Sequence, residues 1–161
     1  MKVAAVQLTS TDNVTENQEL ALAKIREAAG NGARLIVLPE ATSQNFRSGR
    51  LDEQAQTLEG PFATAIQALA EELEVTVVAG MFCPADTVER EGKTINRVTN
   101  TALIAGPGVL GGYDKIHTYD AFDYRESDTV LAGESLVAFD VDDLIVGVAT
   151  CYDIRFPEQF K

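Results

Sequence analysis

Residues 144–158 read LIVGVATCYDIRFPE, and this stretch decides how the chain is expected to fold. Its first part, Leu144–Ala149, is the most apolar run of the chain and predicts a strand that is buried on both faces. Pro157 stands where a helix can begin. Cys151 is therefore expected at a turn from a strand to a helix, above the edge of a sheet.

A thiol at such a turn can act as a nucleophile. The turn exposes the side chain of Cys151 and directs the next backbone N–H groups at the same point, so that an oxyanion site lies beside the sulfur. A buried core cysteine is the alternative, and it is the usual role of a single cysteine. The position of Cys151 alone leaves these two interpretations even.

Two other segments favour the nucleophile. Residues 34–40 read RLIVLPE, a buried strand that ends in Pro39 and the acid Glu40. Residues 113–117 read YDKIH and place Lys115 after a Gly-Gly turn. Glu40, Lys115 and Cys151, in this order, resemble the Glu-Lys-Cys triad of the nitrilase, or carbon–nitrogen hydrolase, superfamily.

The resemblance covers the whole chain, from the segment Met1–Leu8 to Lys161. Glu126, within the sequence YRES, matches a further family residue, a second glutamate between the lysine and the cysteine. The segment Asn100–Ala102 is also similar to the family. Within the superfamily, the sequence CYDIRFPE is most similar to the omega-amidase group, which includes amidases of deaminated glutathione.

The resemblance implies hydrolysis through a thioester. Glu40 would take the thiol proton while Cys151 attacks the carbon of an amide. Lys115 would lower the thiol pKa and would hold the oxyanion together with the backbone N–H of Tyr152. Glu126 would keep Lys115 charged and oriented. This chemistry requires no cofactor.

The implied substrate is a small ω-amide that carries a carboxylate, and ammonia is its expected product. Arg155 is a candidate for binding that carboxylate, and an ion pair with Glu158 is the alternative. Tyr152 stands where nitrilases usually carry Trp. A nitrilase or an N-carbamoyl hydrolase of the same superfamily remains an alternative, as does an inactive truncated fragment that serves as an interaction module.

His117 leaves a different catalytic site open, because a Cys–His pair of the protease type would need the only histidine of the chain. A structural role, with hydrogen bonds inside its own loop, is the favoured interpretation. For Glu40, Lys115 and Glu126 the alternative is an ordinary solvated surface charge. Only their combination with Cys151 favours the catalytic interpretation.

Composition and charge exclude several classes of partner. The chain has 161 residues, 45% of them apolar, which is enough for one domain with its own core. The net charge of −12 argues against nucleic acid or an anionic membrane as a partner. Without an apolar run of membrane-spanning length or a signal peptide, we expect a cytoplasmic protein.

Two further expectations concern metals and disulfides. One histidine and two cysteines, without an HxxxH or CxxC cluster, predict no metal site. A reducing compartment and a catalytic thiol argue against a disulfide between Cys83 and Cys151. Cys83 is therefore interpreted as a small core residue.

The order of the expected elements predicts an α/β domain with a mixed sheet. Helices are expected from an N-cap at Asn13 or Thr15 to Gly30 or Gly32, and from Gly60-Pro61 onward. Residues 41–58 and 114–134 are expected as loops, the first with some helix. The other expected elements are strands over Lys2–Leu8, Leu35–Leu38 and Val75–Phe82, a charged turn over Asp86–Lys93, and hairpins over Arg97–Ala105 with Val109–Tyr113 and over Ser135–Asp140 with Leu144–Ala149.

The resemblance sharpens this fold class to an α-β-β-α sandwich, of which residues 1–161 would be the N-terminal part of one domain, with the C-terminal portion missing. We therefore expect that these residues alone are not a self-sufficient active monomer. The apolar strand Leu144–Ala149 would need cover on both faces, from a longer native chain or from a partner. The family resemblance also implies a homo-oligomer, a dimer or higher.

Overall fold

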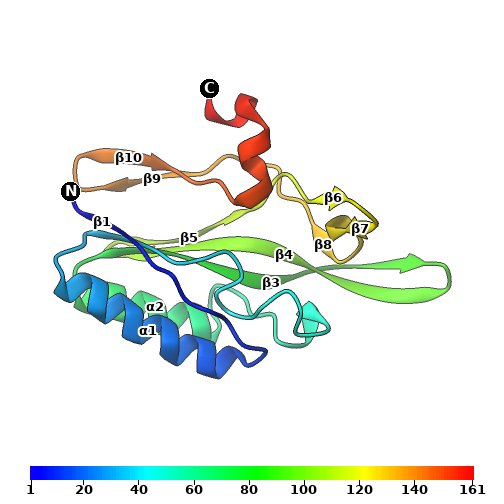
Figure 1. Cartoon of the computed structure of the whole chain (residues 1–161), viewed down its shortest axis with the longest axis horizontal. Coiled ribbons are helices and arrows are strands. Elements are labelled where there is room, and N and C mark those ends of the chain that lie inside the picture. Colours follow the sequence, from blue (N-terminus) through cyan, green and yellow to red (C-terminus); the bar gives the residue numbers. More distant parts are fainter.

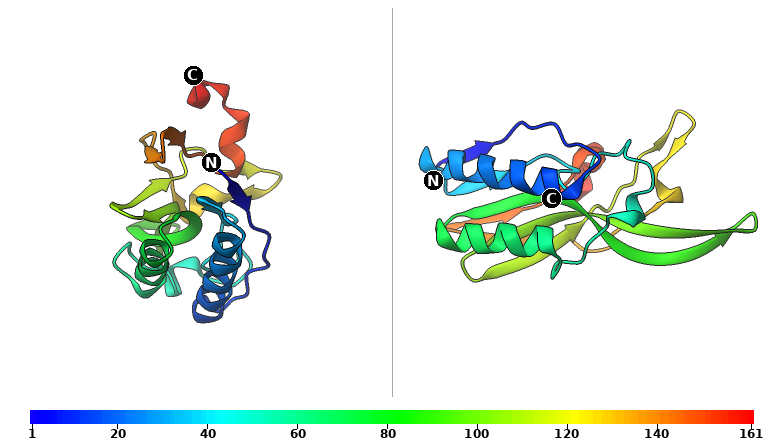
Figure 2. Two further views of the ribbon diagram at one scale, coloured as in Figure 1. Left: turned by 90° about the vertical axis from the view of Figure 1, so that its left-hand side faces the viewer. Right: turned by 90° about the horizontal axis from the view of Figure 1, so that it is seen from below.

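The computed structural model describes all residues from 1 to 161 and arranges them in three layers (Figures 1 and 2). Two helices lie side by side on one face of a six-stranded sheet, and a two-stranded hairpin lies on its other face. The predicted α/β class is confirmed. These layers correspond to helices, first sheet and second sheet of the expected sandwich, and no outer helix covers the hairpin among these residues.

The elements follow one another in an order that alternates helix and strand first and continues with hairpins. They are β1 (Val3–Ala5), α1 (Val14–Gly30), β2 (Leu35–Val37), η1 (Leu51–Glu53), α2 (Pro61–Glu72), β3 (Thr76–Arg90), β4 (Lys93–Gly106), β5 (Val109–Asp114), β6 (Asp120–Ala121), β7 (Tyr124–Arg125), η2 (Glu126–Asp128), β8 (Val130–Leu131), β9 (Ala138–Val141), β10 (Leu144–Gly147), η3 (Cys151–Arg155) and η4 (Pro157–Phe160), where η denotes a 3₁₀ turn.

The central sheet has the strand order β1-β2-β3-β4-β5, and β8 also pairs with β4. Strands β1, β2 and β3 run parallel, because α1 and α2 carry the chain back between them. Strands β3, β4 and β5 are joined by tight turns and pair antiparallel. The mixed sheet predicted from the sequence is therefore confirmed.

Both helices begin where the sequence indicates. The Oδ1 of Asn13 accepts hydrogen bonds from the backbone N–H groups of Thr15 and Glu16, at 2.9 and 3.2 Å, which caps α1. Pro61 opens α2 directly after Gly60. Neither helix is long and apolar enough to cross a membrane.

The main hydrophobic core lies between the helices and the central sheet. Ile25 of α1, Phe62 and Ile66 of α2, and Val77 and Leu103 of the sheet are fully buried in it. A smaller cluster on the opposite face joins the sheet to the hairpin β9–β10, through Leu35, Ile104, Phe139 and Val141. The sheet is thus covered on both faces, as expected for parallel strands.

The prediction of a strand buried on both faces at 144–149 was wrong in two respects. Strand β10 ends at Gly147, and Leu144 and Ile145 are 52% and 79% exposed. The reason is that β10 pairs only with β9 and packs on the central sheet through one face of this hairpin. The first strand was also predicted too long and too buried, since β1 covers Val3–Ala5 and Val3 is half-exposed.

The charged turn predicted at Asp86–Lys93 is not a turn. Strands β3 and β4 continue through it as a two-stranded ribbon that extends beyond the helices and reverses at Glu91-Gly92 (Figures 1 and 2). Both faces of this ribbon meet solvent, so charged residues suit a strand there. The long loop expected at 114–134 also contains the short elements β6, β7, η2 and β8.

Candidate active site

Glu40 lies just beyond the end of β2, at a sharp turn of the chain. The N–H of Leu38 still donates to the carbonyl of Val78 at 2.8 Å, and the chain leaves the sheet at Pro39. Ala41 then has a left-handed backbone, with φ of 58°. A Cβ on Gly80 of β3 would lie 2.8 Å from the Cα of Glu40, so the absence of a side chain there lets this turn approach the sheet.

Lys115 follows β5 and is held by the backbone on both sides. Its N–H donates to the carbonyl of Asn100 at 2.9 Å, and its own carbonyl accepts from the N–H of Gly133 at 2.9 Å. The Lys115 side chain is 2% exposed, and lysines are buried this deeply almost only when they are paired with acids. Its Nζ lies 3.2 Å from Glu40 Oε1 and 2.9 Å from Glu126 Oε2.

Glu126 opens the turn η2 and is as buried as the lysine. Besides Lys115, its carboxylate accepts from the backbone N–H of Tyr119 at 2.6 Å and from Asn100 Nδ2 at 3.2 Å. The same Nδ2 donates to Glu40 Oε1 at 2.7 Å. One buried amide therefore joins two carboxylates that both face one ammonium group.

Asn100 is a site residue that the sequence reasoning did not identify, although its segment was noted. It is 1% exposed and lies opposite Phe82 in the pairing of β3 with β4. The sequence does offer a signal for Asn100. It stands directly before the apolar segment TALIAG, and Asn is uncommon in buried strands.

Cys151 lies in the turn predicted after the strand, the elbow Thr150–Arg155. It follows the segment between the end of β10 and Thr150, whose backbone is extended, and it begins η3. Its φ is 50°, a conformation that costs non-glycine residues of the order of 1–3 kcal/mol. A cavity of about 210 Å³ lies before it, and its lining includes Glu40, Asn100, Gly80 and Cys151. The acid and the thiol thus face the same small space.

The charges of the cluster act on the thiol and on the lysine in opposite directions. Burial and the negative charge of Glu40 raise the pKa of the Cys151 thiol, and Lys115 lowers it only in part. Lys115 thus acts on the thiol in the expected direction, but burial and Glu40 outweigh it. Burial alone would lower the pKa of Lys115, but its hydrogen bonds to Glu126 and the charges of Glu40 and Glu126 outweigh this effect and raise the pKa. The lysine is charged and the resting thiol is protonated near neutral pH.

The remaining candidates have different surroundings. Tyr152 follows the thiol in η3, and its ring packs edge-on against Tyr119, with centroids 5.1 Å apart. Arg155 is exposed and forms no ion pair, so the alternative pairing with Glu158 is not present. The oxyanion role of Tyr152 and the carboxylate-binding role of Arg155 stay predictions.

His117 makes its hydrogen bonds to Asp153 and none to the catalytic cluster. Its Nδ1 lies 2.9 Å from Asp153 Oδ1, and its ring stacks on Phe156 with centroids 3.6 Å apart. It does not line the cavity of Cys151. The hydrogen bonds expected inside the loop are instead made to the elbow.

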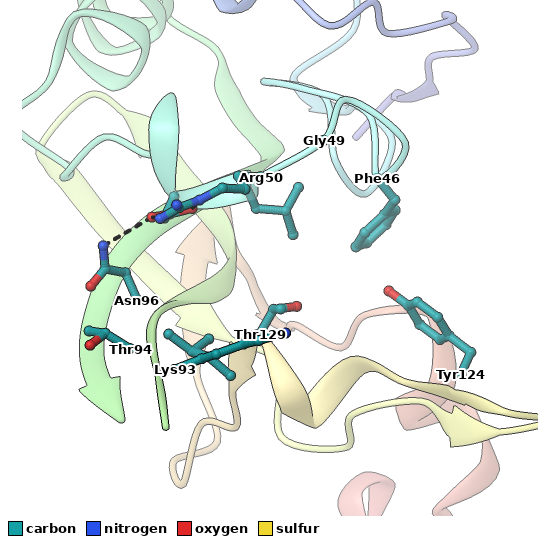
Figure 3. A pocket seen from close by; sticks show the side chains of 11 residues that line it. Phe46, Gly49, Arg50, Lys93, Thr94, Asn96, Tyr124 and Thr129 are labelled. Atoms are coloured by element: carbon teal, nitrogen blue, oxygen red, sulfur yellow. Dashed lines mark hydrogen bonds and ion pairs between the residues drawn. The ribbon is translucent and has the colours of Figure 1, made fainter. Parts of the chain in front are cut away.

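A second cavity, of about 390 Å³, opens between the loop 46–52, the ribbon of β3 and β4, and the segment 124–129 (Figure 3). Figure 3 shows Phe46 and Tyr124 facing each other across one end of it, and Asn96 Nδ2 donating to Asp52 at 3.1 Å on the other side. Burial and the charge of Glu126 raise the pKa of Tyr124, which lines this cavity.

Both cysteines are free thiols, Cys83 in β3 and Cys151 at the elbow. No group of three or more His, Cys, Asp or Glu side chains is arranged to hold a metal ion. The side chains that the structure brings together at this site are one thiol, two carboxylates and one ammonium group.

The comparison with known protein families agrees with this arrangement, since the model of the carbon–nitrogen hydrolase family matches residues 2–161. The chain belongs to the carbon–nitrogen hydrolase family. It is 41% identical to hydrolase Rv0480c of Mycobacterium tuberculosis over 99% of this chain and 55% of that protein. It is 35% identical to the deaminated glutathione amidase of Synechocystis, over 98% of this chain and 60% of that protein.

Solved structures give the same fold. The carbon–nitrogen hydrolase superfamily protein XC1258 from Xanthomonas campestris, which carries an arsenic adduct in its active site, matches with a TM-score of 0.79 and 25% identity. The match covers 97% of this chain and 55% of that one. The chain thus spans about half to three fifths of the length of these relatives.

Proposed function

We propose that this chain carries the catalytic centre of an amidase that cleaves a non-peptide C–N bond of a small carboxylated amide and releases ammonia. The observation that carries the proposal is the convergence of Glu40, Lys115, Glu126 and Cys151 from four separate parts of the chain. The Lys115 ammonium contacts both carboxylates within 3.2 Å, and the cavity beside them holds the acid and the thiol together.

The first half of the reaction forms a thioester. Because the Cys151 thiol is protonated at rest, it needs a base at the moment of attack. Glu40 takes the thiol proton while the sulfur bonds to the amide carbon, and the oxyanion is held by Lys115 and the N–H of Tyr152. Glu40 then gives its proton to the leaving nitrogen, the C–N bond breaks, and ammonia departs.

The second half hydrolyses the thioester. Glu40 takes a proton from water, whose oxygen attacks the thioester carbon, and the C–S bond breaks as the thiol regains the proton. Glu126 and Asn100 keep the Lys115 ammonium in place through both halves. Glu126 accepts directly from Lys115 Nζ, and Asn100 Nδ2 donates to the carboxylates of Glu40 and Glu126, all within 3.2 Å. No step uses a metal or an organic cofactor.

The size of the cavity at Cys151, about 210 Å³, supports a small substrate. The similarity to the deaminated glutathione amidase of Synechocystis supports an ω-amide with a free carboxylate. We propose Arg155 as the residue that binds this carboxylate, because its guanidinium has no partner. A homo-oligomer of the whole protein also remains a proposal.

The test is release of ammonia from α-ketoglutaramate, and of cysteinylglycine from deaminated glutathione, by the protein as its own gene encodes it. Cys151→Ala should abolish release and Cys151→Ser should leave little, because a hydroxyl is a far weaker nucleophile than a thiol at this site. Cys83→Ala is the matched control and should keep the wild-type rate. Iodoacetamide should label Cys151 before Cys83.

Two results would contradict the proposal. Turnover by Cys151→Ala would remove the thioester from the mechanism. Preferential labelling of Cys83 would show that the reactive thiol is elsewhere.

A further inference from the structure

The buried carboxylate of Asp153 connects two segments that are far apart in the sequence. Asp153 is 0% exposed. Its Oδ2 accepts from the backbone N–H of Thr150 at 2.8 Å and from the hydroxyl of Tyr113 at 2.5 Å. Its Oδ1 accepts from the backbone N–H of His117 at 2.9 Å and lies 2.9 Å from the Nδ1 of the same residue.

These partners stand next to the reacting groups in the sequence. Thr150 immediately precedes Cys151, and Lys115 lies between Tyr113 and His117. One carboxylate therefore joins the turn that carries the thiol to the segment that carries the ammonium group. The connection is extended by Gln159, whose Nε2 donates to the hydroxyl of Tyr113 at 2.7 Å.

The elbow needs such support because its backbone is strained. Cys151 has φ of 50°, and a non-glycine residue persists in this conformation only when its surroundings hold it there. The bond from Thr150 N–H to Asp153 fixes the residue just before the strained position. Burial would raise the pKa of Asp153, but the hydrogen bonds from Tyr113, Thr150 and His117 lower it, so the carboxylate is charged at neutral pH.

We propose that Asp153 is a positioning residue, which sets the place of the Cys151 thiol relative to Lys115 without touching the substrate. The inference rests on the proposed roles of Cys151 and Lys115. It differs from a purely structural role because it requires the chemical state of the thiol, and not only the stability of the chain, to depend on Asp153.

The test compares Asp153→Asn and Tyr113→Phe with the wild-type protein as its gene encodes it. The asparagine replaces one acceptor oxygen by an N–H₂ group, so the two groups that face this oxygen lose their acceptor. The phenylalanine removes one bond from the lysine segment to Asp153 and leaves the two contacts of His117 in place. It also removes the acceptor of the Ile116 N–H and of Gln159 Nε2. Asp140→Asn is the matched control, because this residue of β9 is exposed and its side chain makes no hydrogen bond or ion pair.

The first measurement is the rate of Cys151 alkylation by iodoacetamide against pH, which needs no substrate. In the wild type, burial and Glu40 hold the midpoint above that of an ordinary thiol. A loosened elbow moves the sulfur away from both, so the midpoint should fall toward about 8.5 in Asp153→Asn and in Tyr113→Phe. Asp140→Asn should keep the wild-type midpoint.

The second measurement is amide turnover. Both variants should lose about tenfold to a hundredfold in kcat, the scale of a misplaced reacting group, with KM changed by no more than about twofold. A fall in kcat together with a lower alkylation midpoint is the expected signature. Asp140→Asn should turn over at the wild-type rate.

Cys83 reports whether each variant is folded, because burial raises the pKa of its thiol and slows its alkylation. Should Asp153→Asn expose Cys83, the folded Tyr113→Phe variant decides the question. A wild-type alkylation midpoint in the folded variant would overturn the proposal, even where the thermal midpoint falls. Absence of turnover in the wild type would contradict the proposed function, while the alkylation profiles would still decide the role of Asp153.

Discussion

The substitution Gly80→Ala should disable the site without changing any side chain that takes part in it. A Cβ on Gly80 would lie 2.5 Å from the backbone N of Ala41, 2.7 Å from the carbonyl oxygen of Pro39 and 2.8 Å from the Cα of Glu40. Non-bonded carbon contacts settle at about 3.5 Å. The turn that carries Glu40 must therefore withdraw from β3 by up to about 1 Å, since all three atoms belong to the backbone.

A displacement of this size should lower kcat by about 10²-fold, because the Glu40 carboxylate is then no longer placed to take the proton of the Cys151 thiol while it contacts Lys115. Overpacking should also cost about 1–3 kcal/mol in the free energy of unfolding. The assay is ammonia release at saturating substrate, with urea unfolding of the same preparation. Gly111→Ala in β5 is the control, since a Cβ there meets no atom within 4 Å.

A wild-type kcat in folded Gly80→Ala would refute this reasoning. It would mean that the position of Glu40 tolerates a shift of about 1 Å, and that Glu40 is not the group that moves the proton. Equal losses in Gly80→Ala and Gly111→Ala would instead indicate a general effect of alanine in the sheet.

Three further outcomes are expected. Lys115→Arg keeps the charge but changes its shape and reach, so amide turnover should fall by more than ~10²-fold; a near wild-type rate would mean that the lysine supplies only a background field. Glu40→Gln should abolish turnover with little change in the thermal midpoint, because Glu126 still pairs with Lys115, while His117→Asn should keep a substantial fraction; the reverse result would indicate a Cys–His enzyme. The pKa of Asp153 is lowered on folding, so its advantage in stability over Asp153→Asn should be complete above the ordinary aspartate pKa of about 3.9 and lost as the pH falls through the folded value. Urea unfolding between pH 7 and pH 2 measures this difference, and a difference that does not change with pH would contradict the argument.

Much of the site can be placed from the sequence because its residues stand at the ends of strands. Glu40 comes after an apolar run that stops at a proline, and Cys151 comes after another apolar run. Such local patterns specify where the chain leaves a sheet. The structure brings both residues to one cavity and places Lys115 and Glu126 beside it.

Asn100 and Asp153 are different, because their roles depend on pairings between distant segments. Asn100 meets two carboxylates only through the register of β4 against β3 and β5. The partners of Asp153 come largely from a segment about 40 residues away in sequence. The ribbon at Asp86–Lys93 was mistaken for a turn for a related reason, since its charges reflect exposure of both faces and not a break in the strand.

The separation in sequence between the members of the cluster has a consequence for the order in which the protein folds. Lys115 and Glu126 are 11 residues apart, whereas Lys115 and Glu40 are 75 apart, and the elbow joins from the far end of the chain. Closing a longer loop costs more entropy and must await more of the surrounding structure. During refolding, Lys115 should therefore form its ion pair with Glu126 early. The raised pKa of Cys151 should be among the last properties to appear. Brief pulses of iodoacetamide at successive refolding times would record that moment as the loss of ordinary thiol reactivity.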